Sequence, residues 1–163
     1  MKIFIDGSAG TTGLRIKDRL MKRSDVELIT LSEEQRKDTE SRKQALNSAQ
    51  VAFLCLPDAA AVEAVELVEN PDTVIIDTST AHRTSEGWAY GFPELSAEFE
   101  DKIKNSKRIA VPGCHAGGFI ALVYPLVEAG VLGNDALLSC YSLTGYSGGG
   151  KKMIAEYESE DKS

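Results

Sequence analysis

The sequence predicts an α/β protein, in which a doubly wound parallel sheet is followed by the beginning of a second α+β domain. Two patterns support this prediction. Apolar runs of strand length alternate with helical stretches up to about position 111, and the first run opens directly onto a glycine-rich loop that precedes a helix. A chain of 163 residues has room for one well-packed domain but not for two, so we expect the second domain to be incomplete.

Short apolar runs mark the expected strands. Because helical stretches separate them, the strands should lie parallel, joined by right-handed crossovers. Residues 2–6, 26–31, 51–56, 73–77 and 108–111 are expected to form the sheet, with 108–111 as its central strand and a further strand at 137–144.

Helices are expected in the intervening segments. The first follows the glycine loop, a second ends near Asn47, and a third covers residues 58–68 with Asp58 as its cap. Two more are expected at 96–105 and 115–128, and Pro125 should kink or divide the last of these. Residues 145–152 are expected to form a flexible loop, and 157–163 lack a core pattern.

Composition excludes several classes of function. A net charge of −7, with no cluster of Lys and Arg, is the wrong balance for binding nucleic acid. The first strand runs straight into a glycine turn, and no apolar stretch approaches the ~20 residues of a membrane span, so we expect a cytoplasmic protein. Three cysteines without close spacing and two distant histidines predict neither a disulfide framework nor a metal site.

The glycine loop predicts a dinucleotide site. Its glycines have the spacing G-x-x-G-x-x-G, which allows a tight turn, close approach of the backbone to a pyrophosphate, and close packing of the next helix. The alternative is an ordinary turn between a strand and a helix. The position of the loop in the first β-α-β unit favours a Rossmann-like nucleotide site, contacted by Gly7, Ser8, Ala9, Gly10, Thr11, Thr12 and Gly13.

The residues after the second strand favour NADP over NAD. An NAD site usually has an acidic residue there, which accepts a hydrogen bond from the ribose 2′-hydroxyl. This chain has Ser32, Arg36 and Lys37 instead, a hydroxyl and two cations that suit a 2′-phosphate. A solvated loop of mixed charge is the alternative, because Glu33 and Glu34 partly cancel the attraction.

The carboxyl ends of parallel strands meet at one edge of the sheet, where doubly wound proteins bind their ligands. Pro57, Ser79 and Cys114 all follow strands, so we expect them on the same rim as the glycine loop, with Pro57 and Ser79 contacting the cofactor. Arg83, in the loop after the fourth strand, is a candidate for receiving an anionic substrate group; an ordinary surface ion pair is the alternative.

Cys114 is the candidate reactive centre. It follows Pro112 and Gly113 at the expected start of an apolar helix, where unpaired N–H groups and the helix dipole favour the thiolate. A packed turn residue is the alternative. Cys55 and Cys140 lie within apolar runs and are expected to be small core residues.

With these motifs placed, the sequence closely resembles the N-terminal half of the N-acetyl-γ-glutamyl-phosphate reductases of arginine biosynthesis, in their shorter form. The resemblance rests on the glycine loop, the 77–79 loop leading to Arg83, the block Tyr-Gly-Phe-Pro-Glu-Leu at 90–95, Pro-Gly-Cys at 112–114, and residues 144–151.

The resemblance implies a covalent mechanism. Cys114 would attack the acyl phosphate of N-acetyl-glutamyl phosphate, and the thioester would accept hydride from NADPH to give N-acetyl-glutamate 5-semialdehyde and phosphate. In the family, a histidine of the second domain acts as acid and base. His115 is next to Cys114 but should point roughly 100° away on a helix, and His82 has no matching motif; we assign His115, with Arg83, to the substrate.

The expected organisation is a dinucleotide-binding domain at 1–114 and the incomplete start of a substrate domain at 115–163. We expect a truncated reductase that forms homo-oligomers when full length. The alternative is a non-catalytic NADP-binding module that senses the cofactor or assembles with another chain.

Overall fold

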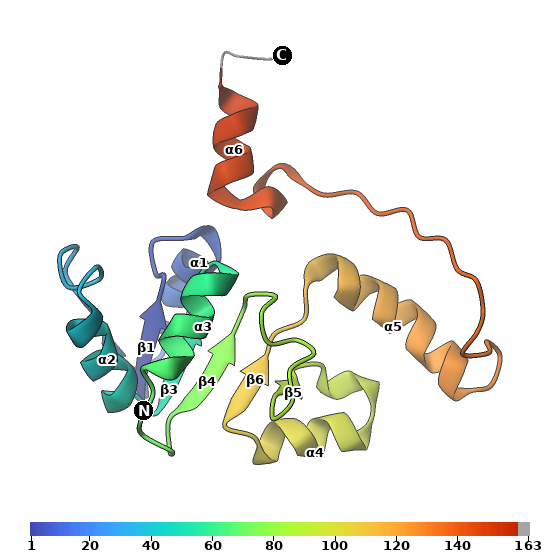
Figure 1. The fold of residues 1–163 in the computed structure, drawn as a ribbon, viewed down its shortest axis with the longest axis horizontal. Coiled ribbons are helices and arrows are strands. Elements are labelled where there is room, and N and C mark those ends of the chain that lie inside the picture. Colours follow the sequence, from blue (N-terminus) through green and yellow to red (C-terminus); the bar gives the residue numbers. More distant parts are fainter. Residues whose placement is uncertain (160–163) are drawn as a thin grey trace.

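The computed structural model describes residues 1–159, and in these residues a single sheet of six parallel strands has the order β2-β1-β3-β4-β6-β5 (Figure 1). Every neighbouring pair is parallel. The predicted fold class is therefore confirmed. The strands are β1 (Lys2–Asp6), β2 (Glu27–Ile29), β3 (Val51–Leu54), β4 (Val74–Asp77), β5 (Ala89–Tyr90) and β6 (Arg108–Ala110).

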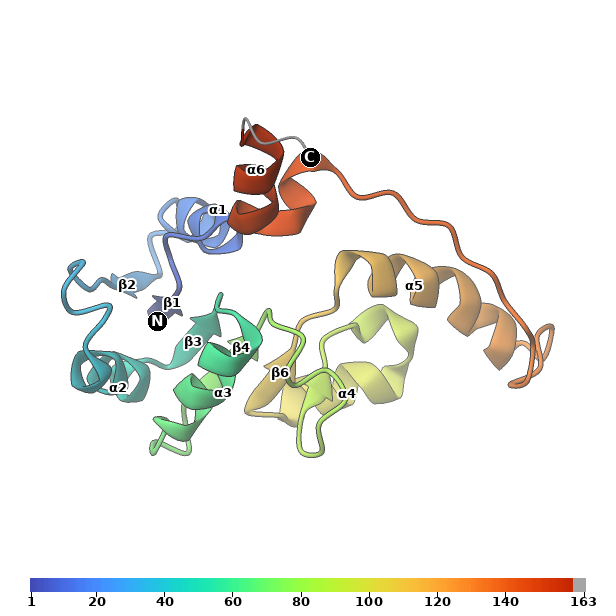
Figure 2. The ribbon, with the colours of Figure 1, turned by 45° about the horizontal axis from the view of Figure 1, so that its top comes forward.

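Helices cover both faces of the sheet. α1 lies on one face, and α2 and α3 lie on the other (Figure 2). The α-helices are α1 (Thr11–Leu20), α2 (Thr39–Ser48), α3 (Asp58–Glu66), α4 (Ala97–Asn105), α5 (Cys114–Glu128) and α6 (Gly150–Glu158), with 3₁₀ turns η1 (Pro93–Leu95) and η2 (Tyr146–Gly149). Among residues 1–159, no helix is long and apolar enough to cross a membrane.

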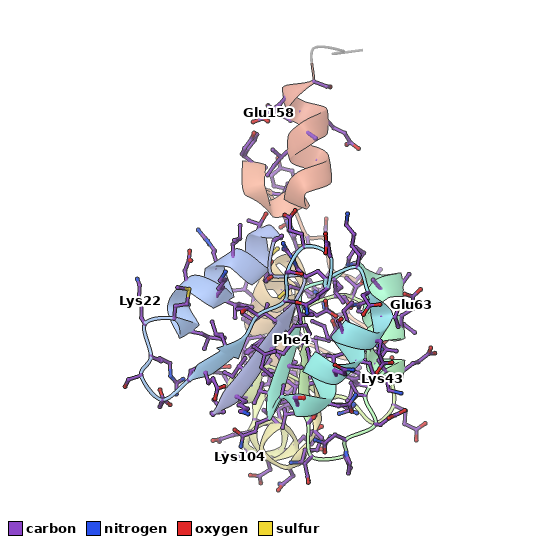
Figure 3. The ribbon with its side chains drawn as sticks, turned by 90° about the vertical axis from the view of Figure 1, so that its left-hand side faces the viewer. Phe4, Lys22, Lys43, Glu63, Lys104 and Glu158 are labelled. Carbon is purple, nitrogen blue, oxygen red and sulfur yellow. The ribbon has the colours of Figure 1, made fainter. Side chains whose placement is uncertain are left out.

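The main core lies between the sheet and helices α2 and α3. Phe4, Ala52 and Ile75 are aligned across β1, β3 and β4, and all three are buried. Leu46 of α2 and Ala61 of α3 belong to the same buried cluster, and the small alanine side chain lets α3 approach the strands closely. Phe4 lies on β1, between β2 and β3 (Figure 3). This core fixes the strand ends that form the rim.

All six strands are parallel, so their carboxyl ends share one edge of the sheet, as expected. Residues 108–111, however, do not form the central strand that the sequence predicted. β6 lies between β4 and β5, next to the edge of the sheet. β5 has only two residues, and its pairing Tyr90↔Ala110 continues as a bond from the Gly91 N–H to the Ala110 carbonyl at 2.8 Å. No alternating pattern marks so short a strand, so the sequence did not predict β5.

Two details of the helices also differ from expectation. Pro57, not Asp58, is the N-cap of α3; Asp58 is the first helical residue, and its carboxylate accepts hydrogen bonds from the backbone N–H and the hydroxyl of Thr80. Helix α5 is not divided at Pro125, and the kink that the sequence predicted as the other outcome stays a prediction. Proline removes one backbone hydrogen bond from a helix, but its carbonyl still accepts the Ala129 N–H at 3.0 Å, and α5 continues to Glu128.

The predicted strand at 137–144 is absent: residues 136–145 have no regular structure and extend from α5 towards α6 (Figure 1). Leu137 is fully exposed, and Cys140 is exposed rather than in the core as predicted. A strand needs a neighbour to pair its backbone groups, and no strand of the described chain lies beside this segment.

The expected flexible loop at 145–152 is instead the turn η2 and the start of α6. The rings of Tyr146 and Tyr157 meet edge to face with centroids 5.9 Å apart, which holds η2 against α6. This small unit projects from the sheet domain (Figure 3). Residues 160–163 of the terminal segment lie outside the described part of the chain.

Candidate functional site

The glycine loop lies where the direction of winding reverses. From β1 the chain crosses to β2 on one side, and β3 then pairs with β1 on the other side. Doubly wound proteins bind ligands at such a switch point, outside the carboxyl ends of the strands. The loop that leaves β1 is therefore at the position where a nucleotide is expected.

Two of the three glycines are required by close backbone approaches. Gly7 has φ +82°, and a Cβ there would stand 2.1 Å from the carbonyl oxygen of Cys55. A Cβ at Gly13 would stand 2.5 Å from the carbonyl oxygen of Gly7. Gly10 closes the turn by donating its N–H to the same carbonyl at 3.0 Å. The sequence predicted this tight turn and close helix correctly.

The start of α1 offers free donors. Its N-cap is Gly10, which has no side chain, and the first turn contains no acidic residue. The N–H groups of the first turn of a helix have no intrahelical partner and attract anions. Ala9, Thr11 and Thr12 are exposed beside them, so a pyrophosphate can reach these N–H groups.

A cavity of about 120 Å³ lies between α1 and the end of β2. Ser8 and Arg36, both predicted to contact the cofactor, line it, and so does Lys17 of α1, which the sequence reasoning missed. Lys17 lies one helical turn after Gly13, on the face that approaches the sheet, and this spacing was the available signal. Two cations and a hydroxyl therefore share one cavity.

Arg36 has an unused donor. Its Nη2 lies 3.4 Å from Oε1 of Glu33, whereas its Nε is buried without a hydrogen-bond partner. A buried N–H without an acceptor is unfavourable, and an anion in the cavity would supply one. The cavity therefore fits a phosphate group of a nucleotide.

Ser32 and Lys37, also predicted to contact the cofactor, do not line this cavity. The hydroxyl of Ser32 accepts the Gln35 N–H at 3.2 Å, and the Ser32 N–H donates to Gln35 Oε1 at 3.0 Å. These bonds form the turn that brings Arg36 over β2. Lys37 is exposed next to that turn.

A buried ion pair supports the end of β1. Asp6, the residue before the glycine loop, accepts from Nη2 and Nε of Arg42 on α2 at 2.9 and 3.1 Å. Their side chains are only 6% and 15% exposed. Nothing in the sequence marked this pair, because the two residues are far apart in the chain and lie on different elements.

The loop after β4 faces inward. Ser79 is buried and its hydroxyl donates to Asp77 Oδ2 at 2.6 Å, so its side chain stabilises the loop instead of facing a ligand. Pro57 is exposed on the neighbouring β3 end of the same rim. Of the two residues predicted there, Pro57 is thus the more accessible to a ligand.

Arg83 lies behind the turn that carries the cysteine. Its Nε donates to the Val111 carbonyl at 3.0 Å and its Nη2 to the Thr78 carbonyl at 3.4 Å. A Cβ at Gly113 would stand 2.6 Å from Nη1, so the guanidinium is in close contact with the backbone of that turn.

Cys114 is the first residue of α5 and is exposed. Its N-cap, Gly113, offers no side-chain acceptor, and the first turn has no acidic residue, so the helix dipole acts on the thiol unopposed. Cys114 and His115 both line an open cleft of about 460 Å³ between α5 and residues 138–142. A substrate at this cleft can reach the sulfur.

The ring of His115 contacts the irregular segment, residues 136–145. Its Nδ1 pairs with the Ser142 hydroxyl, and its Nε2 lies 3.3 Å from Oγ1 of Thr144. Both ring nitrogens thus have partners on residues 136–145. Within residues 1–159, no group of three or more His, Cys, Asp or Glu side chains is arranged to hold a metal ion.

The two other thiols differ from Cys114 in their surroundings. Cys55 is half-buried at the end of β3, and burial raises the pKa of its thiol to about 11. Cys140 is exposed on the irregular segment and lines the same cleft as Cys114, but no helix starts there. Cys114 alone of the three is the first residue of a helix.

Comparison with known proteins gives consistent matches. Residues 2–105 match the family model described as semialdehyde dehydrogenase, NAD binding domain. The chain is 54% identical over 157 residues to the N-acetyl-gamma-glutamyl-phosphate reductase of Chelativorans sp. (strain BNC1), a match that covers 96% of this chain and 51% of the relative. It is 50% identical over 158 residues to the reductase of Trichormus variabilis, covering 97% of this chain and 49% of the relative.

The chain therefore spans about half the length of the curated relatives that it matches. Among solved structures, aspartate semialdehyde dehydrogenase from Francisella tularensis superposes with a TM-score of 0.67 at 17% identity, over 96% of this chain and 48% of that one. The Candida albicans enzyme with NADP gives 0.54 at 18% identity, over 78% and 46%. At these identities the structural likeness shows the fold.

Proposed function

This chain belongs to the semialdehyde dehydrogenase family and carries its NAD-binding domain, and from this membership we propose that it is the cofactor-binding, cysteine-bearing part of an NADP-dependent N-acetyl-γ-glutamyl-phosphate reductase. The resemblance that the sequence alone indicated is confirmed by homology at about 50% identity. The observation that supports the proposal best is the exposed Cys114 at the start of α5, on the rim that also carries the glycine loop.

The proposed reaction proceeds through Cys114. Its thiolate attacks the acyl carbon of N-acetyl-glutamyl phosphate, a C–S bond forms, the C–O bond to phosphate breaks, and inorganic phosphate leaves. NADPH, when bound, supplies the hydride that reduces the thioester to N-acetyl-glutamate 5-semialdehyde. The thiolate then departs unchanged. The helix dipole at Cys114 stabilises its negative charge at both the first and the last step.

The residues of the rim suit NADP. The free N–H groups at the start of α1 would hold the pyrophosphate, with the glycine loop allowing close approach. Arg36 and Lys17 would hold the 2′-phosphate in the cavity beside β2, and the buried, unpartnered Nε of Arg36 supports this assignment. We further assign Pro57 to the cofactor and Arg83 and His115 to the region of the substrate.

In this proposal, residues 1–114 are the dinucleotide-binding domain and 115–163 begin the substrate domain. The exposed apolar residues of the second part support the division: Leu122 and Tyr141 are 73% and 87% exposed. Because the matched relatives are about twice as long, we infer that their second half supplies the acid–base group and covers this surface, in a homo-oligomer.

A non-catalytic NADP-binding module is the second candidate function. The observation that favours it is that both histidine rings already have polar partners. Nδ1 of His82 faces Asp77, and both nitrogens of His115 face hydroxyls, so neither ring is placed as a free general base beside Cys114. Turnover measurements separate the two functions.

The Arg36→Ala variant is expected to lose the preference for NADP. By calorimetry, the parent chain should bind NADP more tightly than NAD, and the variant should lose about tenfold or more in NADP affinity, since a hydrogen bond to a charged group contributes ~1.5–3 kcal/mol. NAD affinity should change little. Arg19→Ala removes an exposed cation of α1 outside the cavity and is the matched control. Equal affinity of the parent for the two nucleotides would contradict the assignment.

Cys114 is expected to be alkylated first among the three cysteines. Brief treatment with iodoacetamide near neutral pH, followed by peptide mapping, should label Cys114 ahead of Cys140, which is also exposed, because only Cys114 lies at a helix start. Cys55 should remain almost unlabelled, since its thiol has a pKa of about 11. Labelling of Cys140 at the same rate or faster would argue against Cys114 as the nucleophile.

A further inference from the structure

Asp77 anchors the loop between β4 and β5. The carboxylate is fully buried at the end of β4 and has three partners: the Ser79 N–H at 2.9 Å, the Ser79 hydroxyl at 2.6 Å, and Nδ1 of His82 at 2.7 Å. An ionised carboxylate only accepts hydrogen bonds, so Nδ1 of His82 carries a proton. The tautomer of His82 is therefore set by Asp77.

His82 is held on a second side by an aromatic ring. It is 8% exposed and stacks on Trp88 with centroids 4.1 Å apart and planes 12° from parallel. Within the loop, Ser85 donates its N–H to the His82 carbonyl at 3.2 Å, and Trp88 donates to the Ser85 carbonyl at 3.3 Å. The imidazole is thus fixed both at one nitrogen and on one face.

The next residue, Arg83, reaches the cysteine turn. It donates to the Val111 carbonyl, and a Cβ at Gly113 would stand 2.6 Å from its Nη1, so a side chain at that position would displace the guanidinium. Gly113 is the N-cap of α5 and directly precedes Cys114. The loop after β4 and the connection from β6 to α5 run side by side (Figures 1 and 2). Trp88 also leads directly into β5, which pairs with β6.

We propose that His82 is a positioning residue for Cys114: held between Asp77 and Trp88, it fixes Arg83, and the guanidinium of Arg83 fixes the turn that presents the thiol. This inference rests on the proposed role of Cys114. His82 does not touch the substrate in this account. It acts by holding the turn that places Cys114 as the first residue of α5, a setting in which cysteine thiols are typically reactive.

Alkylation of the 163-residue chain by iodoacetamide tests the proposal without cofactor or turnover. The measured quantity is the rate at Cys114 divided by the rate at Cys140, with Cys55 labelling as a monitor of unfolding. His82→Ala and Arg83→Ala should each lower the ratio about fivefold, which is on the order of the net contribution of a single hydrogen bond. His82→Asn, whose amide nitrogen can replace Nδ1 towards Asp77, should stay within about twofold of the parent, a rescue that a purely steric role would not give.

Two further variants test whether Arg83 transmits the effect of His82 to Cys114. If the effect passes through Arg83, the double variant His82→Ala/Arg83→Ala should be no slower than Arg83→Ala alone. Gly113→Ala, which leaves the loop intact but displaces the guanidinium, should lower the ratio as far as Arg83→Ala. Gly113→Ala also keeps the test decisive if a His82 variant does not fold.

An unchanged ratio in Arg83→Ala and Gly113→Ala, or additive effects in the double variant, would overturn the proposal. So would a fall in the ratio that occurs only when Cys55 labelling rises in parallel, because that pattern shows general unfolding. Absence of reductase activity even after addition of the second half of a relative would count against the proposed function and leave this result untouched, since labelling requires no reaction at the substrate site.

Discussion

The 163-residue chain assayed alone is expected to oxidise N-acetyl-glutamate semialdehyde, with NADP and phosphate, at least ~10²–10⁴-fold more slowly than a full-length relative. That range is the usual contribution of general acid–base help, and neither histidine of this chain is free to provide it beside Cys114. Loss of substrate positioning should lower the rate further, because one wall of the open cleft at Cys114 is formed by the irregular segment 136–145 and not by a packed domain.

The assay needs two comparisons. Calorimetry must show that the same preparation binds NADP, so that a low rate reflects missing catalytic groups rather than a missing fold. Adding a polypeptide that covers the second half of a relative, such as the Chelativorans enzyme, should raise the rate, and Cys114→Ser should abolish that gain. Turnover by the chain alone within tenfold of the relative would contradict our account of where the acid–base group lies.

Arg42→Ala is expected to destabilise the domain by about 3–5 kcal/mol, because it leaves the carboxylate of Asp6 buried without its cation. For a chain of this size the melting temperature should fall by roughly 6–20 °C. Nucleotide binding should weaken as well, since Asp6 directly precedes the glycine loop. Thermal unfolding monitored by circular dichroism measures the change.

Arg23→Ala is the matched control. Arg23 pairs with Asp25 at 2.6 Å, but these side chains are 53% and 62% exposed, and exposed ion pairs contribute little to stability because water screens them. The double variant Asp6→Leu/Arg42→Met should recover much of the stability lost in Arg42→Ala, because it removes the buried charge together with its partner. Equal destabilisation by Arg42→Ala and Arg23→Ala would show that burial of the pair is not what matters.

The fold class was predictable because it depends on local signals. Alternating apolar runs and helical stretches require a parallel sheet, and the glycine loop marks the first crossover. Gly7 and Gly13 are required by approaches within one β-α unit and its neighbouring strand. The placement of Cys114 at a helix start also follows from adjacent residues, Pro112 and Gly113, in the chain.

Predictions failed where a segment depends on distant partners. Residues 137–144 have an apolar strand pattern, but no neighbouring strand of the described chain is available to pair with them, so they stay irregular and Cys140 is exposed. β5 was missed for the opposite reason: two residues carry no pattern, and only the edge of β6 makes them a strand.

The sequence by itself determined strands β1 to β4 and β6, the glycine turn and the cysteine at the start of a helix, because each arises from residues close together in the chain. Only the tertiary structure decided which side chains meet at the rim: Lys17 with Arg36, Asp6 with Arg42, and Arg83 with the turn before Cys114. These contacts join different elements, and their partners are chosen by the packing of helices against the sheet, which the spacing of residues along one element does not record.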